Sequence, residues 1–409
     1  MLVFIWLVQS RGLLDDLDLL NRGHRFTRVW ESCNGFDYSG QYFLTVGSYY
    51  ENNTIRRYYP IEYMGDDLGI YLLYPWMQKN LRLNYKLAYF LFSVGLVLTS
   101  YINTLLGFHL LFNDAKKRIR LITCIVTSLF CIFCLYILDV YIWSYFLTSF
   151  IPLVTWAVKK RINYNRFLHL ASVLFIMGLL IGIGNQFRRS AGTGLALFIL
   201  ILLLSMEKKK VSYLEKAILI TLLLLPITFS DVYFGYQLQR RDVWLTENNQ
   251  IINHSNLIRN HVLWHSMYMG LSFVENPYGI IYSDSAGIGK ARQIQPGVWA
   301  YTTDSEDILR REYLSIIRAN PFFILKTYIQ KTMYSLLFIF IAFNIGSIFL
   351  MELKPPVISQ IPFIVALAIY TLPGIMGWPN PAFILGAINV ASLWSIILFN
   401  EWATKNHFV

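Results

Sequence analysis

Three short stretches of this chain set acids, arginines or histidines among aromatic residues and glycines. The longest stretch covers residues 260–284, in the middle of a polar interval that spans residues 231–322. Loops of this length without a functional role are uncommon. Aromatic faces with scattered hydroxyl, amide and carboxyl groups suit a sugar, which shows apolar C–H patches ringed by hydroxyls. A folded cap packed on its own aromatic residues is the alternative, and the sequence weighs the two evenly.

Histidines and aromatic residues of this stretch are candidates for binding an acceptor molecule. His261 and His265 are four residues apart and would share one face of a helix, as acceptor contacts or zinc ligands do. Histidines with a purely structural role are the commoner case. We expect an acceptor-binding group made of His261, Trp264, His265, Tyr278 and Asp284. The sequence defines no complete metal site and leaves the use of a divalent cation open.

Acids ahead of the first long apolar run are the candidates for a general base. Asp66 and Asp67 precede an apolar, aromatic stretch, where partial desolvation would raise the pKa of a carboxyl group and suit it to accept a proton. The alternative is that these acids cap a short helix that starts at Leu68. Asp37 is the third candidate, and we favour Asp66 or Asp67 because their segment leads directly into an interfacial helix.

Two arginines lie in a glycine-rich turn between apolar runs. Arg188 and Arg189 fall within residues 182–194, and guanidinium groups bind phosphate oxygens in pairs. We expect this turn to hold the phosphate of a donor, with Lys326 and Lys331 as a second group of cations at the same depth. The alternatives are that the arginines bind lipid headgroups or nearby acids, and that the lysines extend to the membrane surface.

Membrane-spanning helices must position these residues. The chain has 409 residues, of which 56% are hydrophobic and 14% charged, which excludes an ordinary soluble protein. Apolar runs near the length that crosses a bilayer recur along the whole chain. They cover residues 85–112, 119–138, 140–158, 167–184, 193–206, 212–230, 332–351, 357–376 and 382–400. We expect an all-α polytopic membrane protein with about nine to ten transmembrane helices and two external loop regions.

This pattern divides the chain into four parts. They are an N-terminal segment with the first external loop, a set of transmembrane helices, a large external loop region and the C-terminal transmembrane helices. In that order they cover residues 1–84, 85–230, 231–322 and 323–409.

The net charge of +11 reports membrane topology rather than a nucleic-acid partner. The first long polar interval covers residues 9–84 and the second covers residues 231–322. Both carry slightly more acids than bases, so the excess of Lys and Arg lies in short connections between apolar runs. These connections are residues 116–120, 159–166 and 208–216 and the turn at Lys354. All of them fall on one side of the membrane, which the positive-inside rule assigns to the cytoplasm. The two long intervals are then external.

Two motifs of the first interval resemble those of the multi-pass glycosyltransferases of the GT-C fold class, such as bacterial protein mannosyltransferases and aminoarabinose transferases. Phe36-Asp37-Tyr38-Ser39-Gly40-Gln41-Tyr42 is similar to their "DGQxY" stretch, and Gly65-Asp66-Asp67-Leu68-Gly69-Ile70-Tyr71-Leu72 to their acidic first-loop motif. The resemblance implies a sugar donor on a polyprenyl phosphate, an acidic base in the first loop and basic residues on the donor phosphate. It also implies an external glycan, lipid or protein acceptor, and a place in the bacterial inner membrane.

One departure from that family concerns the first helix. The family places its acid soon after a complete first transmembrane helix, whereas residues 1–8 form an apolar run too short to span. The counterpart of the family's acid among Asp37, Asp66 and Asp67 therefore stays open.

Two other classes of function fit the same layout. One is a carrier protein for lipid-linked sugars, of the flippase or polymerase kind, which would place functional charge or broken helices at mid-membrane. The other is a non-catalytic subunit of envelope assembly, whose aromatic loop would bind a protein. Acid, arginine and histidine side chains that converge at one place would favour the enzyme.

Overall fold

The computed structural model describes most of the chain beyond the first interval. The described residues are 33, 46–51, 54–60, 68–83, 85–113, 116–137, 140–164, 167–207, 211–248, 262–298, 300 and 302–406. Four predicted site residues lie outside this part of the chain: Asp37, Asp66, Asp67 and His261.

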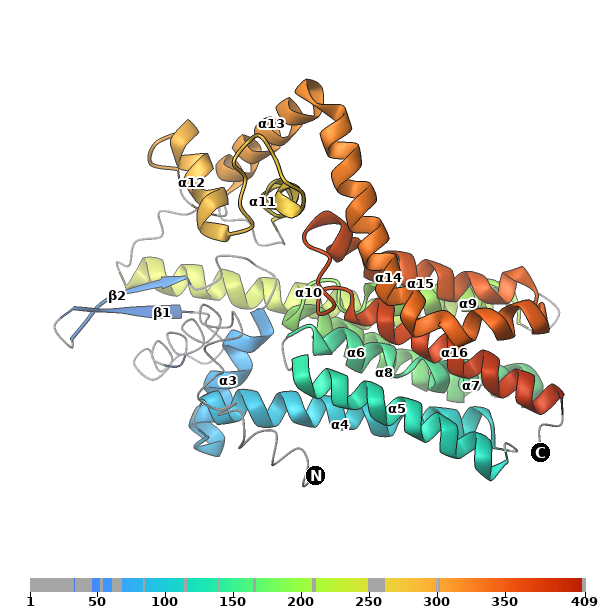
Figure 1. Ribbon diagram of the computed structural model, residues 1–409. Helices are drawn as coiled ribbons and strands as arrows, with labels where there is room; N and C mark the ends of the chain where they lie inside the picture. Colours follow the sequence, from blue (N-terminus) through green and yellow to red (C-terminus); the bar gives the residue numbers. More distant parts are fainter. Residues whose placement is uncertain are drawn as a thin grey trace.

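Long apolar helices form one bundle (Figure 1). Within the described ranges, six helices are long and apolar enough to cross a membrane. They are α4 (Tyr85–Leu111), α5 (Lys117–Ile137), α8 (Phe167–Phe187), α10 (Tyr213–Glu247), α14 (Pro321–Leu353) and α15 (Val357–Met376). The bundle also contains α6 (Ile142–Thr148), α7 (Ile151–Tyr164), α9 (Thr193–Leu204) and α16 (Leu385–Lys405). The predicted class, a helical polytopic membrane protein, is confirmed.

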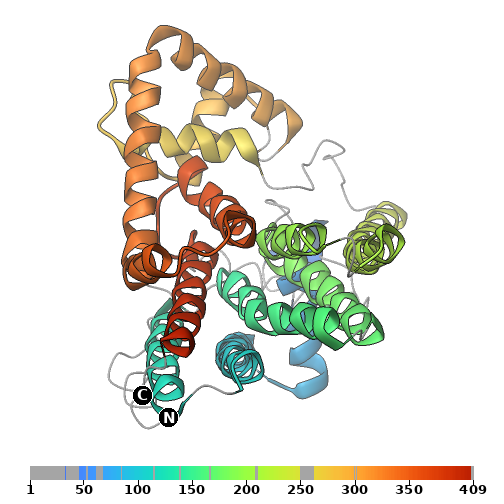
Figure 2. The same ribbon diagram turned by 90° about the vertical axis from the view of Figure 1, so that its right-hand side faces the viewer.

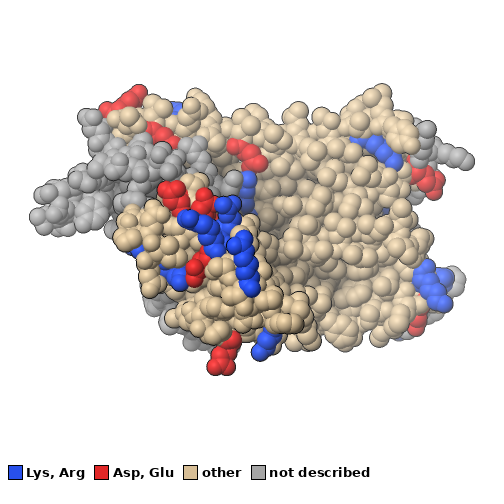
Figure 3. Space-filling model, turned by 90° about the horizontal axis from the view of Figure 1, so that it is seen from above, with Lys and Arg blue, Asp and Glu red and all other residues tan. Residues whose placement is uncertain are grey.

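The surface of the bundle has the charge distribution of a protein in a bilayer. In the view from above, charged side chains gather at the two ends, and the middle of the face carries none (Figure 3). Many large apolar side chains of the long helices are exposed, including Leu129 on α5 and Ile341 on α14. The basic connections between α4 and α5 and between α14 and α15 lie together at one end, drawn on the right in Figure 1, which we call the basic end.

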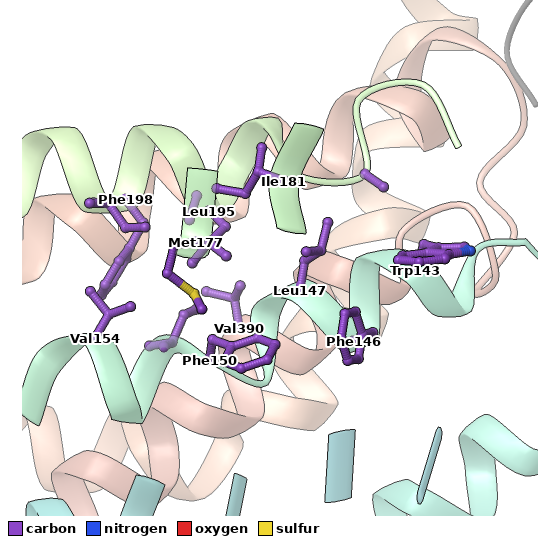
Figure 4. Packing of buried hydrophobic residues seen from close by; sticks show 14 of the residues in the cluster. Trp143, Phe146, Leu147, Phe150, Val154, Met177, Ile181, Leu195, Phe198 and Val390 are labelled. Carbon is purple, nitrogen blue, oxygen red and sulfur yellow. The ribbon is translucent and has the colours of Figure 1, made fainter. Parts of the chain in front are cut away.

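The core of the bundle lies between α6, α7, α8, α9 and α16, where apolar side chains interdigitate (Figure 4). Trp143 stacks on Phe187 with ring centroids 4.5 Å apart. Every residue of α16 from Leu393 to Leu398 is buried, so this helix is enclosed on all of its faces.

Glycines allow α8 and α10 to approach closely. Gly178 and Gly182 are four residues apart on α8, and both face α10. A side chain at position 178 would overlap with the carbonyl oxygen of Leu223, and one at position 182 would lie 2.9 Å from the Cβ of Ser230. Small residues at this spacing bring helix backbones together in membranes, where van der Waals packing holds helices to each other.

One predicted span is divided into two helices. The apolar run at residues 140–158 forms α6, which ends at Thr148, and α7, which starts at Ile151. Pro152 explains the break, because it has no N–H to donate to the carbonyl of Thr148 and its ring excludes a continuous helix there. It is accommodated in the first turn of α7.

The long polar intervals contain more regular structure than the sequence predicted. Helix α10 continues past Asp231 to Glu247, because no proline interrupts residues 231–247 and good helix formers such as Gln, Leu and Arg recur from residue 237 onward. The first interval contains an antiparallel hairpin of β1 (Val46–Glu51) and β2 (Thr54–Pro60), which contacts α10. Helix α3 (Leu68–Leu81) follows the hairpin in the chain.

A small helical unit, which we call the cap, lies toward the end of the bundle opposite the basic end (Figures 1 and 2). It consists of α11 (Leu263–Gly270), a short 3-10 helix (Leu271–Phe273), α12 (Asp284–Ile294) and α13 (Thr303–Ala319). The apolar residues of α13 recur at helical spacing and pack against α11, so the cap has its own core: Tyr268, Leu271, Ile308, Leu309, Tyr313 and Ile316.

Capping residues fix both ends of α13 and its connection to the bundle. Thr302 caps the first turn, and its side chain accepts a hydrogen bond from the backbone N–H of Ser305. Asn320 then caps α14, whose first residue is Pro321. Because α14 begins in the cap and its later part lies in the bundle, it ties the two together (Figures 1 and 2).

Candidate functional site

Arg188 lies at the cap end of the bundle, in the turn between α8 and α9. Its guanidinium carbon is 4.6 Å from the ring centroid of Tyr141, a geometry that favours a cation–π interaction. The turn is braced from within, because Gly192 donates its backbone N–H to Oδ1 of Asn185 at 2.8 Å. It is braced from outside by Tyr370 of α15, whose hydroxyl donates to the carbonyl of Ala191 at 2.9 Å. Arg188 is therefore presented by a fixed turn.

The neighbouring arginine has a different environment. Nη1 of Arg189 lies 3.6 Å from Oδ1 of Asp231 on α10, and both side chains are substantially exposed. The same carboxylate oxygen accepts a hydrogen bond from Nε2 of Gln186 at 2.6 Å. Arg189 thus has an acid partner in the bundle, which it shares with Gln186.

Tyr282 brings the cap to the Arg188 turn. Its ring packs on Trp378, in the connection between α15 and α16, with centroids 4.7 Å apart. Its hydroxyl lies close to Gly377, because a Cβ atom added to that glycine would be 3.9 Å from the hydroxyl oxygen. Burial raises the pKa of Tyr282 above its usual value, and electrostatic interactions with Tyr141 and Asp284 raise it further. The positive charge of Arg188 lowers this pKa and partly offsets these effects. Residues from three separate segments therefore share one electrostatic environment.

A histidine and two acids order the part of the cap beside Tyr282. Nε2 of His265 lies 3.1 Å from Oδ1 of Asp284, whose side chain is 45% exposed, whereas that of His265 is 5% exposed. Glu306 of α13 accepts hydrogen bonds from the backbone N–H groups of Trp264 and His265, at 2.7 and 2.8 Å. The buried Glu306 thereby caps α11, and His265 in turn holds the more exposed carboxylate of Asp284. Gly287 gives the imidazole room, because a side chain there would lie 2.6 Å from its Cε1 atom.

Two predicted acceptor-binding residues lie elsewhere in the cap. The ring of Trp264 packs 5.8 Å from that of Tyr313, in the core of the cap. Tyr278 is 37% exposed and rests against Phe323, 5.5 Å away between centroids. Helix α11 starts at Leu263. The predicted helical face shared by His261 and His265 is therefore described only for His265, because His261 lies outside the described residues.

The two predicted lysines do not form one group of cations. Lys326 is exposed on α14, while Lys331 is fully buried. Nζ of Lys331 donates to the carbonyl of Met376, at 3.4 Å. The same atom would lie 2.5 Å from a Cβ atom added to Gly270. Lys331 therefore joins α11 of the cap to the C-terminal end of α15, where a cation is favourable for the helix dipole.

The sequence reasoning missed three aromatic residues: Tyr141, Tyr282 and Trp378. Tyr282 lies two positions before Asp284, within the stretch that was singled out, and Trp378 lies in a Gly-Trp-Pro-Asn-Pro turn. Their roles depend on contacts between segments about 50 to 100 positions apart, which no local spacing indicates.

The first turn of α3 lies beside the turn that carries Arg188. A side chain at Gly69 would come 2.8 Å from the ring of Phe187, the residue before Arg188. In the sequence, Asp66 and Asp67 come directly before this helix. The first turn of α3 thus lies next to the residue that precedes Arg188.

Within the described ranges, no group of three or more His, Cys, Asp or Glu residues could hold a metal ion. No protein-family model, curated protein or solved structure matches this chain. The arrangement of the residues around Arg188 and Tyr282 therefore carries the functional argument.

Proposed function

We propose that this chain is a membrane glycosyltransferase that transfers a sugar from a polyprenyl-phosphate donor to an external glycan, lipid or protein acceptor. The observation that supports it most is that Arg188 of the bundle and Tyr282 of the cap are both held at the α15–α16 connection. Arg188 is held there through Tyr141 and Phe383, and Tyr282 through Trp378. The cation and the hydroxyl lie at the cap end of the bundle, and the paired imidazole and carboxylate of His265 and Asp284 lie in the cap.

The chemistry of such a transfer fits these groups. As the glycosidic bond breaks, negative charge grows on the phosphate oxygen that leaves with the polyprenyl chain. A guanidinium fixed at that oxygen stabilises the transition state more than the ground state. An acceptor hydroxyl must lose a proton as it attacks, and Asp66, Asp67 and Asp37 are the proposed bases. The position of Gly69 beside Phe187 supports Asp66 or Asp67 over Asp37.

The proposed topology extends the six long helices. With α6–α7, α9 and α16 as further crossings, the bundle would have about nine spans and a GT-C-like layout. The basic end would face the cytoplasm of a bacterial cell, and the cap would lie outside the inner membrane. A cysteine at the exposed position Ser285 should then react with an impermeant thiol reagent in intact cells, and protection until lysis would contradict this orientation.

A paired substitution tests the transfer itself. Membranes that contain the protein are supplied with a panel of polyprenyl-phosphate hexoses labelled in the sugar, and release of label from the donor lipid is measured. Arg188→Gln should lower this rate by about one to two decades, as expected for loss of a charge-assisted bond to phosphate. Arg189→Gln is the matched control and should change it little, because Asp231 already engages that arginine.

Other outcomes would favour the other classes. A carrier would move labelled donor across the membrane without breaking the glycosidic bond, and an assembly subunit would do neither. Equal rates in both variants and in the wild type, with lowered melting temperatures, would assign Arg188 a structural role.

A further inference from the structure

Tyr282 is held by its ring, while its hydroxyl stays available at the junction between the cap and the bundle. The ring is held by Trp378, which is itself packed edge-on against Phe273 of the cap, with centroids 5.1 Å apart. These contacts fix the ring at the junction between cap and bundle. The hydroxyl itself makes no hydrogen bond to any residue that the structure describes.

The protonation state of this hydroxyl determines what it can bind. Burial and the neighbouring Asp284 raise the pKa of Tyr282, so the group stays protonated at physiological pH. A protonated phenol can donate one hydrogen bond, and this bond is strongest when the acceptor is an anionic oxygen. Arg188 lies over the ring of Tyr141, which packs on Phe383 with centroids 4.7 Å apart. Phe383 belongs to the same α15–α16 connection as Trp378, so the positive charge of Arg188 would attract the same anion.

We propose that Tyr282 and Arg188 together form the binding site for the donor phosphate, with the Tyr282 hydroxyl donating a hydrogen bond to a phosphoryl oxygen. This inference rests on the proposed function and adds a residue of the cap to a site otherwise built from the bundle. The phosphate is then bound by one cation and one neutral donor, contributed by two parts of the chain. The cap must be docked on Trp378 for the site to be complete.

A binding experiment on the purified full-length protein tests this assignment. The probes are undecaprenyl monophosphate, phosphatidic acid and inorganic phosphate, added to protein in phosphatidylcholine nanodiscs. Tyr282→Phe removes one oxygen atom and keeps the ring on Trp378. It should weaken undecaprenyl phosphate binding about tenfold or more, the usual effect of losing a hydrogen bond to a charged group.

Tyr233→Phe is the matched control. Tyr233 has an exposure of 38%, close to the 37% of Tyr282, but its ring packs on Phe234 of α10. Its variant should bind undecaprenyl phosphate as the wild type does. Arg188→Lys, which keeps the charge and loses the planar fork, should also bind more weakly.

The outcomes separate this inference from the proposed function. Wild-type affinity in Tyr282→Phe, with binding lost in Arg188→Gln, would overturn the role of Tyr282 and leave the function standing. An equal affinity of the wild type for phosphatidic acid and undecaprenyl phosphate, lowered equally by Tyr282→Phe, would support the anion site and contradict a polyprenyl donor. A melting temperature for each variant shows that the comparison is made on folded protein.

Discussion

The bundle and the cap are both helical, but different contacts hold them together. In the bundle, apolar side chains and close glycine contacts do so, as between α8 and α10. In the cap, a small apolar core is joined by buried polar contacts, chiefly those of Glu306 with the first turn of α11. The cap reaches the bundle through few side chains, notably Tyr282, Phe273 and Lys331. Substitutions should therefore affect the two regions separately.

The largest expected effect is in the bundle. Gly178→Leu would force the leucine side chain against the backbone of α10 and should lower the free energy of unfolding by about 3 kcal/mol. Thermal unfolding in detergent measures it. The control is Gly95→Leu on α4, where a side chain meets no atom within 4 Å and the change should have little effect. Equal losses in both variants would contradict the close packing of α8 on α10.

A smaller effect, confined to the cap, is expected for Glu306→Ala. The substitution leaves two buried backbone N–H groups of α11 without acceptors, at a cost of about 2 kcal/mol. Hydrogen exchange should increase in α11 and α12 and stay unchanged in α16. Asp307→Ala, at the next position, removes only an exposed ion pair with Arg310 and should leave exchange as in the wild type. Increased exchange throughout the bundle would show that the two regions are not separate.

The sequence predicted the bundle far better than the site, for a physical reason. Hydropathy reports which segments can cross a bilayer, so the apolar runs and the class of fold followed from it. Polarity marks the membrane boundary and not the end of a helix, which is why α10 extends beyond Asp231. The break before Ile151 had a signal in Pro152 that the apolar run outweighed.

The candidate site depends on contacts between distant segments. Local spacing singled out Arg188, His265 and Asp284, but it could not show that Tyr282 packs on Trp378 or that Arg189 pairs with Asp231. Nor could composition separate Lys326 from Lys331, because their difference is one of burial alone. Such pairings are decided by the tertiary arrangement of the helices.

Alkaline pH offers a milder way to disturb the cap. Burial raises the pKa of Tyr268 to about 12 and that of Tyr313 above its usual value, as it does for Tyr282. Below about pH 10 these groups are protonated in both the folded and unfolded states, so their stabilisation is fully present. Above it the unfolded state loses protons first, and stability falls as the pH rises toward the raised pKa values. At pH 11, Tyr313→Phe should recover about 1 kcal/mol of this pH-dependent loss of stability. The measurement is the melting temperature of the variant and the wild type against pH. An equal loss in both proteins would contradict the raised pKa of Tyr313 as a cause.

The smallest effect is expected for Arg189→Gln. Its ion pair with Asp231 is largely exposed, so the stability should change by less than about 0.5 kcal/mol. Binding of undecaprenyl phosphate should also stay near the wild-type value. A loss as large as that of Arg188→Gln would show that both arginines hold the phosphate, and would remove the contrast between them.

Photo-crosslinking tests most directly whether the bundle and the cap share one polyprenyl-phosphate site. A polyprenyl phosphate that carries a photoreactive group beside the phosphate is irradiated with the full-length protein in membranes, and labelled peptides are identified by mass spectrometry. Label should appear both in the α8–α9 turn around Arg188 and in the cap around Tyr282, and excess unlabelled undecaprenyl phosphate should abolish both. Label confined to the lipid-facing surfaces of α5 and α14, unaffected by competitor, would contradict a shared site.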